Sequence, residues 1–228
     1  MRLRKHTRRH VTLLFATLLF AALIGSLASP CLAQTDAGGT LAEWINKLAG
    51  LETVPDLDIA ALRQQAAERV KSKADGVPIK RSPVAPELTR LPQLIVQVRF
   101  DDDAAVVRPE SYRTLGRIAD ALTHPTLLTY KFLIVAHTVS TGRRDNNLTL
   151  SQRRADVIRD VLVNTFKISP KRLQAIGLGE EQLLDAAHPS APTNQRIQVA
   201  TIGNALEPER AASAKGAPAP RPPVPKRR

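Results

Sequence analysis

Apolar residues alternate or cluster in four short stretches of the chain, and each stretch predicts a β-strand. The stretches are rich in β-branched residues and stop at polar or turn-forming residues, as strands do. They cover residues 94–100, 130–136, 173–177 and 197–201. The second stretch is apolar almost without interruption, which is typical of a strand in the centre of a sheet.

Four other segments carry apolar residues at helical spacing. Pro109 fits the first position of the third helix, and the pair His124-Pro125 ends it. In the fourth segment, Thr149 and Gln152 have the spacing of a capping box, which predicts that the helix begins just ahead of Arg154. The four stripes are Leu41, Trp44, Ile45 and Leu48; Ile59, Leu62, Ala66 and Val70; Tyr112, Leu115, Ala119 and Leu122; and Arg154, Val157, Ile158, Val161, Leu162 and Phe166.

The order of these elements predicts the fold class of residues 93–203. Helices that cross between strands imply some parallel pairing, so we expect a two-layer β-α-β-α-β-β sandwich with a mixed four-stranded sheet. Residues 34–92 should hold a short helical hairpin, packed on the domain or loosely tethered, and a proline-containing linker from about residue 71. The alternative for this segment is a docking surface for another envelope protein, anchored by Trp44. Residues 204–228 are rich in Pro, Ala, Lys and Arg and predict a disordered tail.

The N-terminus, residues 1–33, has the pattern of a secretory signal peptide. Five basic residues precede an apolar run over 11–28, and small residues predict cleavage before Gln34. An uncleaved membrane anchor and a lipoprotein attached at Cys31 are the alternatives. We therefore expect a protein of the periplasm of a Gram-negative envelope. Association with the outer membrane is compatible with this pattern, and contact with a membrane requires that this segment is retained.

The charge and the single cysteine narrow the classes of partner. Loss of the five N-terminal basic residues would lower the formal net charge from +12 to +7, and the tail from residue 207 holds six basic and two acidic residues. The surplus is therefore mostly in the tail, which would solubilise the chain or attract an anionic polymer. Export makes nucleic acid an unsuitable partner.

A chain without Cys31 has no thiolate, and Asp101-Asp102-Asp103 lacks the ligand spacing of a calcium loop, so we expect no metal or cofactor.

Polar side chains gather after the second strand and at the start of the fourth helix. They include the hydroxyls of Thr138, Ser140 and Thr141 and the amides of Asn146 and Asn147. The free N–H groups of a helix N-terminus and the guanidinium of Arg154 would join them and favour a carboxylate or phosphate. In the alternative interpretation, Arg154 lies along the apolar helix face or pairs with an acid such as Asp145.

The run His137-Thr138-Val139, followed by asparagine, leucine-serine and arginine-alanine, resembles the signature of the OmpA-like peptidoglycan-binding domain. The resemblance covers residues 95–201 and includes Phe100, the run from Gly177 to Glu180, and the run from Asn194 to Ile197. It implies non-covalent binding to the peptide stem of peptidoglycan, where an aspartate and an arginine of the family grip diaminopimelate.

The resemblance also assigns roles within the site. Arg154 takes the carboxylate role and Asn147 shapes the loop, while Thr138 and Asn194 line or brace the pocket. Arg196 supports these residues from behind.

Val139 stands where the family has its aspartate, and valine has no acceptor for an ammonium. Removing one partner of a buried charge pair costs on the order of 2–5 kcal/mol, or roughly 30- to several-thousand-fold in affinity. Three outcomes are open: Asp145 replaces the acid, the basic tail aids weak binding, or the domain is a degenerate scaffold for protein–protein interactions in the periplasm. We favour weak or altered peptidoglycan binding.

An enzyme would need a base held by an acid and within reach of a nucleophile. His137, Ser140 and Asp145 are close in sequence, but nothing resembles a nucleophile elbow or a zinc motif. We therefore expect no catalytic activity.

Overall fold

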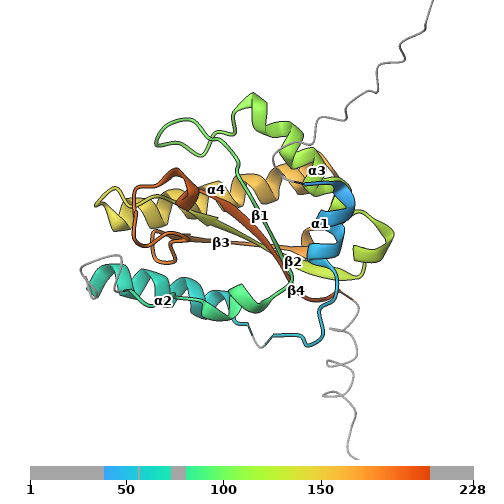
Figure 1. The fold of residues 1–228 in the computed structure, drawn as a ribbon, viewed down its shortest axis with the longest axis horizontal. Coiled ribbons are helices and arrows are strands. Elements are labelled where there is room, and N and C mark those ends of the chain that lie inside the picture. The colour runs from blue at the N-terminus through green and yellow to red at the C-terminus, as the bar shows by residue number, and fades with distance from the viewer. Residues whose placement is uncertain (1–38, 56, 73–80, 206–228) are drawn as a thin grey trace, which may run out of the picture. The chain divides into compact units, whose positions relative to one another are not determined.

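The computed structural model describes residues 39–55, 57–72 and 81–205 (Figure 1). The predicted signal peptide and the part of the predicted tail beyond residue 205 lie outside the described residues. No helix within the described ranges is long and apolar enough to cross a membrane.

The four predicted strands form one mixed sheet, as expected. The strand order is β1-β4-β2-β3; β4 pairs antiparallel with both of its neighbours, and β2 pairs parallel with β3. The first strand is shorter than predicted, because only an isolated bridge between Phe100 and Val107 continues it after the sheet pairing ends. The strands are β1 (Gln93–Val96), β2 (Tyr130–His137), β3 (Leu173–Gly179) and β4 (Ile197–Asn204).

Three of the four strands run in the same direction. Strand β4 is antiparallel to β1 and to β2, so β1 and β2 share a direction, and β3 is parallel to β2. The segments that follow these three strands therefore meet at one end of the sheet. We call this end the loop rim; it comprises residues 101–108, 138–143 and 180–196.

The main hydrophobic core lies on one face of the sheet, under three helices. Helices α3 and α4 are the crossovers that the sequence predicted, and α1 packs beside α3 (Figure 1). Phe132 and Ile134 of the central strand are fully buried there, together with Trp44 of α1. The helices are α1 (Leu41–Leu48), α3 (Tyr112–Leu122) and α4 (Arg144–Asn164).

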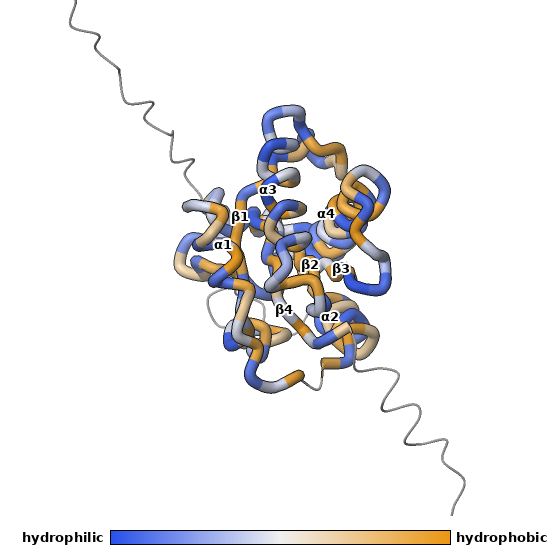
Figure 2. The backbone as a smooth tube through the Cα atoms, turned by 90° about the vertical axis from the view of Figure 1, so that its right-hand side faces the viewer, coloured by the Kyte–Doolittle hydropathy of each residue, from blue (hydrophilic) through white to orange (hydrophobic). Residues whose placement is uncertain are grey.

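The opposite face of the sheet is also covered. Helix α2 (Ile59–Ser72) and the 3-10 turn η2 (Pro86–Arg90) pack a second apolar cluster against Leu133 and Val135. Hydrophilic stretches of the backbone lie mainly in the outer loops (Figure 2). The two N-terminal helices thus add to the two-layer sandwich by packing on opposite faces of the sheet.

Two expectations for the segment ahead of the sheet are wrong. Helices α1 and α2 form no hairpin, because the apolar stripe of each belongs to a different core cluster. The proline-containing stretch after residue 81 is not a free linker either. Pro86 begins a 3-10 turn that buries Leu88 completely, beside the buried Ala85.

Helix α4 begins ten residues ahead of Arg154, so the predicted capping box is wrong. Thr149 and Gln152 lie inside the helix, and the side chain of Gln152 accepts a hydrogen bond from the backbone N–H of Gly177 at 2.9 Å. The helix lies so close to β3 that a Cβ atom on Gly177 would stand 2.1 Å from the backbone nitrogen of Gln152. Glycine permits this close packing, which extends the helix toward the loop rim.

Candidate ligand-binding site

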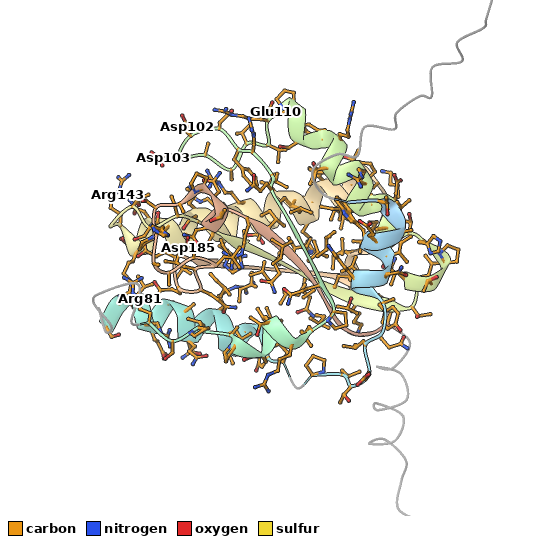
Figure 3. The ribbon with its side chains drawn as sticks, viewed as in Figure 1. Arg81, Asp102, Asp103, Glu110, Arg143 and Asp185 are labelled. Atoms are coloured by element: carbon orange, nitrogen blue, oxygen red, sulfur yellow. The ribbon has the colours of Figure 1, made fainter. Side chains whose placement is uncertain are left out.

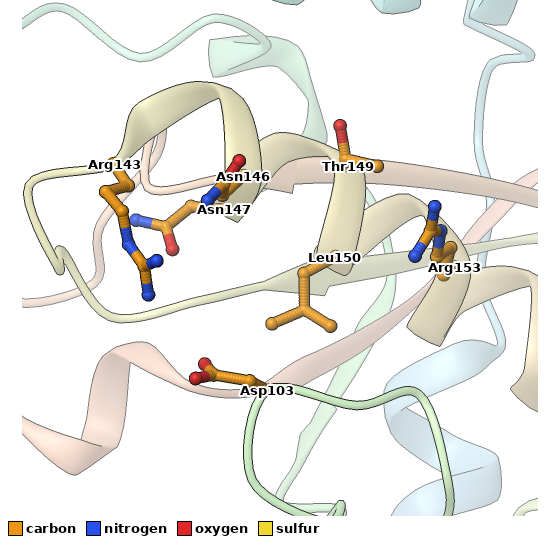
Figure 4. Close-up of a pocket in the computed structure, with 7 residues that line it drawn as sticks. All are labelled: Asp103, Arg143, Asn146, Asn147, Thr149, Leu150 and Arg153. Atoms are coloured by element: carbon orange, nitrogen blue, oxygen red, sulfur yellow. The ribbon is translucent and has the colours of Figure 1, made fainter.

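A pocket of about 280 Å³ opens at the loop rim, between the first turns of α4 and the turn after β1 (Figure 4). Its wall combines both charge signs with side-chain amides. A mixed wall of this kind suits a ligand that carries a carboxylate and an ammonium close together. The lining residues are Asp103, Arg143, Asn146, Asn147, Thr149, Leu150 and Arg153.

Arg154 lies behind this pocket rather than at a helix N-terminus. Its Nε donates to the carbonyl oxygen of Ala104 at 2.9 Å, and its Nη2 to that of Asp101 at 3.4 Å. The guanidinium lies 4.8 Å from the ring centroid of Phe100, and only 4% of the residue is exposed. Arg154 therefore holds the turn after β1 in place, and Nη1 has no hydrogen-bond partner among the described residues.

The electrostatic surroundings of Arg154 come from the same turn. Burial lowers the pKa of its guanidinium, while the carboxylates of Asp103 and Asp102 act in the opposite direction. Asp103 has a left-handed backbone, with φ of 51°, a conformation that aspartate tolerates better than most residues. Its exposed side chain points toward the pocket (Figure 4). The acidic triplet forms a turn, and its third member is the acid of the pocket wall.

Asn147 joins the loop after β2 to the segment after β3. Its side-chain nitrogen donates to Glu180 Oε2 at 2.6 Å, and its oxygen accepts from the hydroxyl of Thr141 at 2.9 Å. Ser140 donates to the other oxygen of Glu180 at 3.0 Å. Glu180 is buried. Three hydrogen bonds join its carboxylate, the amide of Asn147 and the hydroxyls of Thr141 and Ser140, and they fix the course of the loop.

A second buried carboxylate, Glu181, joins two arginines from distant parts of the chain. Arg144, at the start of α4, contacts both oxygens of Glu181, at 2.9 and 2.6 Å. Arg81 lies 2.9 Å from Glu180 and 3.7 Å from Glu181. Arg81 and Arg143 lie at the same end of the sheet in Figure 3. These ion pairs fasten the segment ahead of β1 to the loop rim.

His137 and Thr138 end the central strand and point into the protein. His137 Nε2 lies 3.2 Å from Gln198 Oε1, while His137 Nδ1 and the hydroxyl of Thr138 have no partner. Gln198 uses its amide nitrogen to donate to Gln93, so its oxygen accepts from a neutral imidazole. Burial and the nearby charge of Arg196 lower the pKa of His137 to about 3. His137 is therefore an uncharged structural residue.

Arg196 and Asn194 brace the long loop between β3 and β4. Asn194 is fully buried; its oxygen accepts from the backbone of Leu184 and Asp185, and its nitrogen donates to carbonyls of the same loop. Arg196 donates to the carbonyl oxygen of Gln182 at 2.9 Å, and burial lowers its pKa to about 10. Both residues hold the loop rim together, and neither lines the pocket at α4.

Two residues of the expected site have no direct part in the pocket. Val139 is half-buried just after β2, and it is absent from the residues that line the cavity. Asp145 is exposed in the first turn of α4, and no ion pair joins it to Arg154 within the described part of the chain. The pairing of Arg154 with Asp145 that the alternative interpretation allowed does not form, because carbonyl oxygens of the turn after β1 accept from the guanidinium instead.

Sequence reasoning missed the residues that give the pocket its charge. The sequence patterns assign no ligand contact to Asp103, Arg143 or Arg153, although all three line the pocket. The signal was present in the strand order: parallel strands end at one edge, so an acidic triplet after β1 and a polar loop after β2 must be neighbours. The buried Glu180 and Glu181 follow β3 and reach the same edge.

Two of the three residues considered for catalysis have separate partners. His137 contacts Gln198, and the hydroxyl of Ser140 donates to Glu180. No group of three or more metal-ligating side chains is found in the described ranges.

Parts of the chain are similar to known proteins. Residues 99–198 match the model of the OmpA family. The chain is 32% identical over 116 residues to outer membrane porin F of Pseudomonas aeruginosa, covering 50% of this chain and 32% of the porin. It is 33% identical over 86 residues to a peptidoglycan-associated lipoprotein of Mesorhizobium japonicum, covering 38% of this chain and 49% of the lipoprotein.

A solved structure of the OmpA-like domain of FopA1 from Francisella tularensis is also similar, with a TM-score of 0.41 and 17% identity. The match covers 49% of this chain and 74% of that domain chain. The chain spans about a third of the length of the porin and about half of the length of the lipoprotein.

Proposed function

We propose that this chain is a non-catalytic cell-envelope protein that binds peptidoglycan non-covalently through the peptide stem. The observation that carries the proposal is the pocket at α4, whose wall presents Asp103 opposite Arg143 and Arg153. A diamino acid of the stem offers an ammonium and a carboxylate to such a wall. A relative of similar sequence is named as a peptidoglycan-associated lipoprotein, which supports the same partner.

In this proposal Asp103 supplies the acid that Val139 does not. Asp103 lies on a different loop, but Arg154 holds that loop at the rim through two backbone carbonyls. Arg154 then positions the turn from behind the pocket, and Arg143 and Arg153, which line the pocket, take the carboxylate. Thr138, Asn147, Asn194 and Arg196 keep the loops of the rim in place.

The exposure of Asp103 sets the expected strength. An exposed charge pair contributes up to about 1 kcal/mol, less than a buried one. Binding should therefore be weaker than in a domain with a buried acid at position 139. The basic residues at the end of the chain would add attraction to an anionic polymer. We place the protein in the periplasm, with an outer-membrane association if the N-terminal segment is retained.

Sedimentation of the mature protein with purified sacculi tests the proposal. Asp103→Asn keeps the shape and the left-handed backbone but removes the charge, and we expect retention to fall about fivefold. Asp102→Asn is the matched control: it makes the same charge change one residue away, outside the pocket lining, and should bind like the parent. Equal retention of the two variants would exclude Asp103 from the site.

Val139→Asp probes the same question from the other loop. We expect it to tighten binding, and to restore retention when combined with Asp103→Asn, because one acid near the rim then replaces the other. If neither change has an effect, the explanation for weak binding is wrong.

A second candidate function is a scaffold for protein–protein contacts in the periplasm. Val139 and the engagement of Arg154 by backbone carbonyls favour it. It predicts no retention by sacculi, together with a stable protein partner in pull-downs from the envelope.

A further inference from the structure

A groove of about 1010 Å³ lies away from the pocket at α4, along the outer edge of the sheet. Strand β1 is an edge strand, because β4 is its only neighbour in the sheet. Ile95, Val96 and Gln97 all line the groove although successive residues of a strand point to opposite faces. The floor of the groove is therefore the backbone edge of the strand, and not one of its faces.

The two walls of the groove come from different elements. One wall combines Glu110, in the 3-10 turn ahead of α3, with Arg113 and Arg117 of α3, and the other includes Leu184 of the loop between β3 and β4. Ile95 is 46% exposed and Leu184 is 56% exposed, so each offers an uncovered apolar side chain to an occupant. An unpaired edge flanked by two walls is the geometry in which an added strand binds.

The charge of the groove selects the occupant. Four arginines line it, and Glu110 is the only acid among its lining residues. Arg117 stacks on the ring of Trp44 at 4.2 Å and Arg196 is buried, but both guanidinium groups keep their positive charge. The side chains of Arg99 and Arg113 are exposed and have no hydrogen bond or ion pair to any described residue. The surface is therefore basic where it is open to solvent.

We propose that this groove binds an acidic, extended peptide segment of another protein, which adds as a strand to the free edge of β1. Backbone hydrogen bonds to the edge give the segment its extended form. Its acidic side chains face Arg99 and Arg113, and its apolar side chains rest on Ile95 and Leu184. This interaction goes beyond the proposed binding of peptidoglycan and uses a different part of the surface.

Other occupants fit the charge less well. The chain's own tail from residue 207 has six basic and two acidic residues, so it is repelled by the groove. In a second copy of the chain paired edge to edge, the arginines of one groove would face those of the other, and like charges opposite each other destabilise a strand pair.

Selection from a displayed library of random eight-residue peptides against the full mature chain tests the proposal. We expect enrichment of peptides with acidic residues alternating with β-branched ones. Each enriched peptide is then measured by fluorescence anisotropy against the parent and against Arg99→Glu/Arg113→Glu. We expect the double variant to bind at least tenfold more weakly. The variant Lys171→Glu, an exposed charge reversal remote from the groove, should bind like the parent.

The strand addition has its own control. A peptide N-methylated at alternate residues cannot donate hydrogen bonds to the edge of β1, and it should lose binding while keeping its charges.

Enriched peptides without an acidic bias, equal binding to the double variant, or undiminished binding of the N-methylated peptide would each overturn the proposal. The proposal would also be overturned if the parent binds no peptide but self-associates, and if the double variant abolishes this self-association. The occupant of the groove would then be a second copy of the chain. Retention by sacculi should be the same for the parent and the double variant, so a failure of the peptidoglycan proposal is a separate result.

Discussion

His137 is a buried residue whose ionisation opposes folding. Its imidazole is held neutral by burial and by the neighbouring charge of Arg196, and it points its Nε2 at Gln198. A histidine of the signature run could suggest acid–base chemistry from sequence alone. Its buried surroundings instead make His137 a structural residue at the end of the central strand β2.

The lowered pKa of His137 predicts a loss of stability in acid. The unfolded chain takes up a proton near pH 6.5, whereas the folded chain does so only near pH 3. Stability is therefore complete above pH 6.5 and falls as the pH drops toward 3, by about 1.4 kcal/mol per unit. We expect urea unfolding to give a free energy about 2 kcal/mol lower at pH 5 than at pH 7.5 from this group.

The variant His137→Gln should flatten this part of the pH profile, because its amide does not titrate in that range. His124→Gln, in the loop ahead of β2, should keep the parent's slope. If His137→Gln and the parent lose the same stability between pH 7.5 and pH 5, the proton is taken up elsewhere.

The residue scale also shows the limit of prediction from sequence. Asn147 and Asn194 could be named because their positions in the signature fix their roles, and the structure gives both a bracing contact set. Asp103 could not be ranked above Asp101 or Asp102 from sequence. The choice among three adjacent acids depends on one left-handed backbone angle and on the path of the turn that Arg154 holds.

At the scale of elements, the contact between α4 and β3 sets the position of the pocket. Gly177 and Gly179 let the first turns of α4 lie directly on the strand backbone, and Ser151 donates its hydroxyl to the carbonyl of Leu148 while accepting from Gly179. The helix therefore reaches the loop rim, where Asn146 and Asn147 enter the pocket wall. A helix starting at the predicted capping box would have left these amides in a loop.

Gly177→Ala should disturb this contact. The added methyl group would stand 2.1 Å from a backbone atom of α4, which cannot swing away as a side chain can. Overpacking of this kind costs on the order of 1–3 kcal/mol, and we expect the upper end of that range in urea unfolding. Gly203→Ala is the matched control, since its new carbon would meet Val54 at an ordinary 3.6 Å. Equal stabilities of the two variants would show that helix and strand are not in close contact.

The periodic patterns predicted the existence of the main elements and their order. Strongly apolar strands and amphipathic helices leave a signal in sequence, and so the mixed sheet and its crossover helices were predicted correctly. Helix ends were harder: Thr149 and Gln152 carry cap-like side chains, yet close packing on Gly177 continued the helix through them. Tertiary contact outweighed local capping preference there.

For the whole molecule, the two N-terminal helices belong to the fold of the sheet. Trp44 and Leu48 of α1 are buried in the main core, and Leu62 of α2 and Leu88 of η2 are buried in the second cluster. The domain boundary predicted at residue 93 cuts both sets of contacts. Sequence periodicity identified these helices but contained no information on which face of the sheet each would cover.

A chain that begins at Gln93 should therefore be much less stable than the full chain. Loss of several buried side chains, each contributing about 1.5–3 kcal/mol, should lower the free energy of unfolding by more than about 5 kcal/mol. Urea unfolding followed by far-UV circular dichroism measures the free energy of unfolding of both chains. This signal does not require Trp44, which the shorter chain lacks. A chain that begins at Gly39 is the control and should match the parent. If the chain from Gln93 is equally stable, the boundary at residue 93 is a true domain boundary.

The shared direction of β1, β2 and β3 separates two demands on the sequence. Residues that face the helices must satisfy packing, whereas the three loops that leave the same end of the sheet can exchange functional groups among themselves. A residue in one of these loops can then change without disturbing the packing, and in the proposed site the acid comes from a neighbouring loop. Recognition in such a protein can drift from one loop to the next over evolution while the layers beneath stay constant.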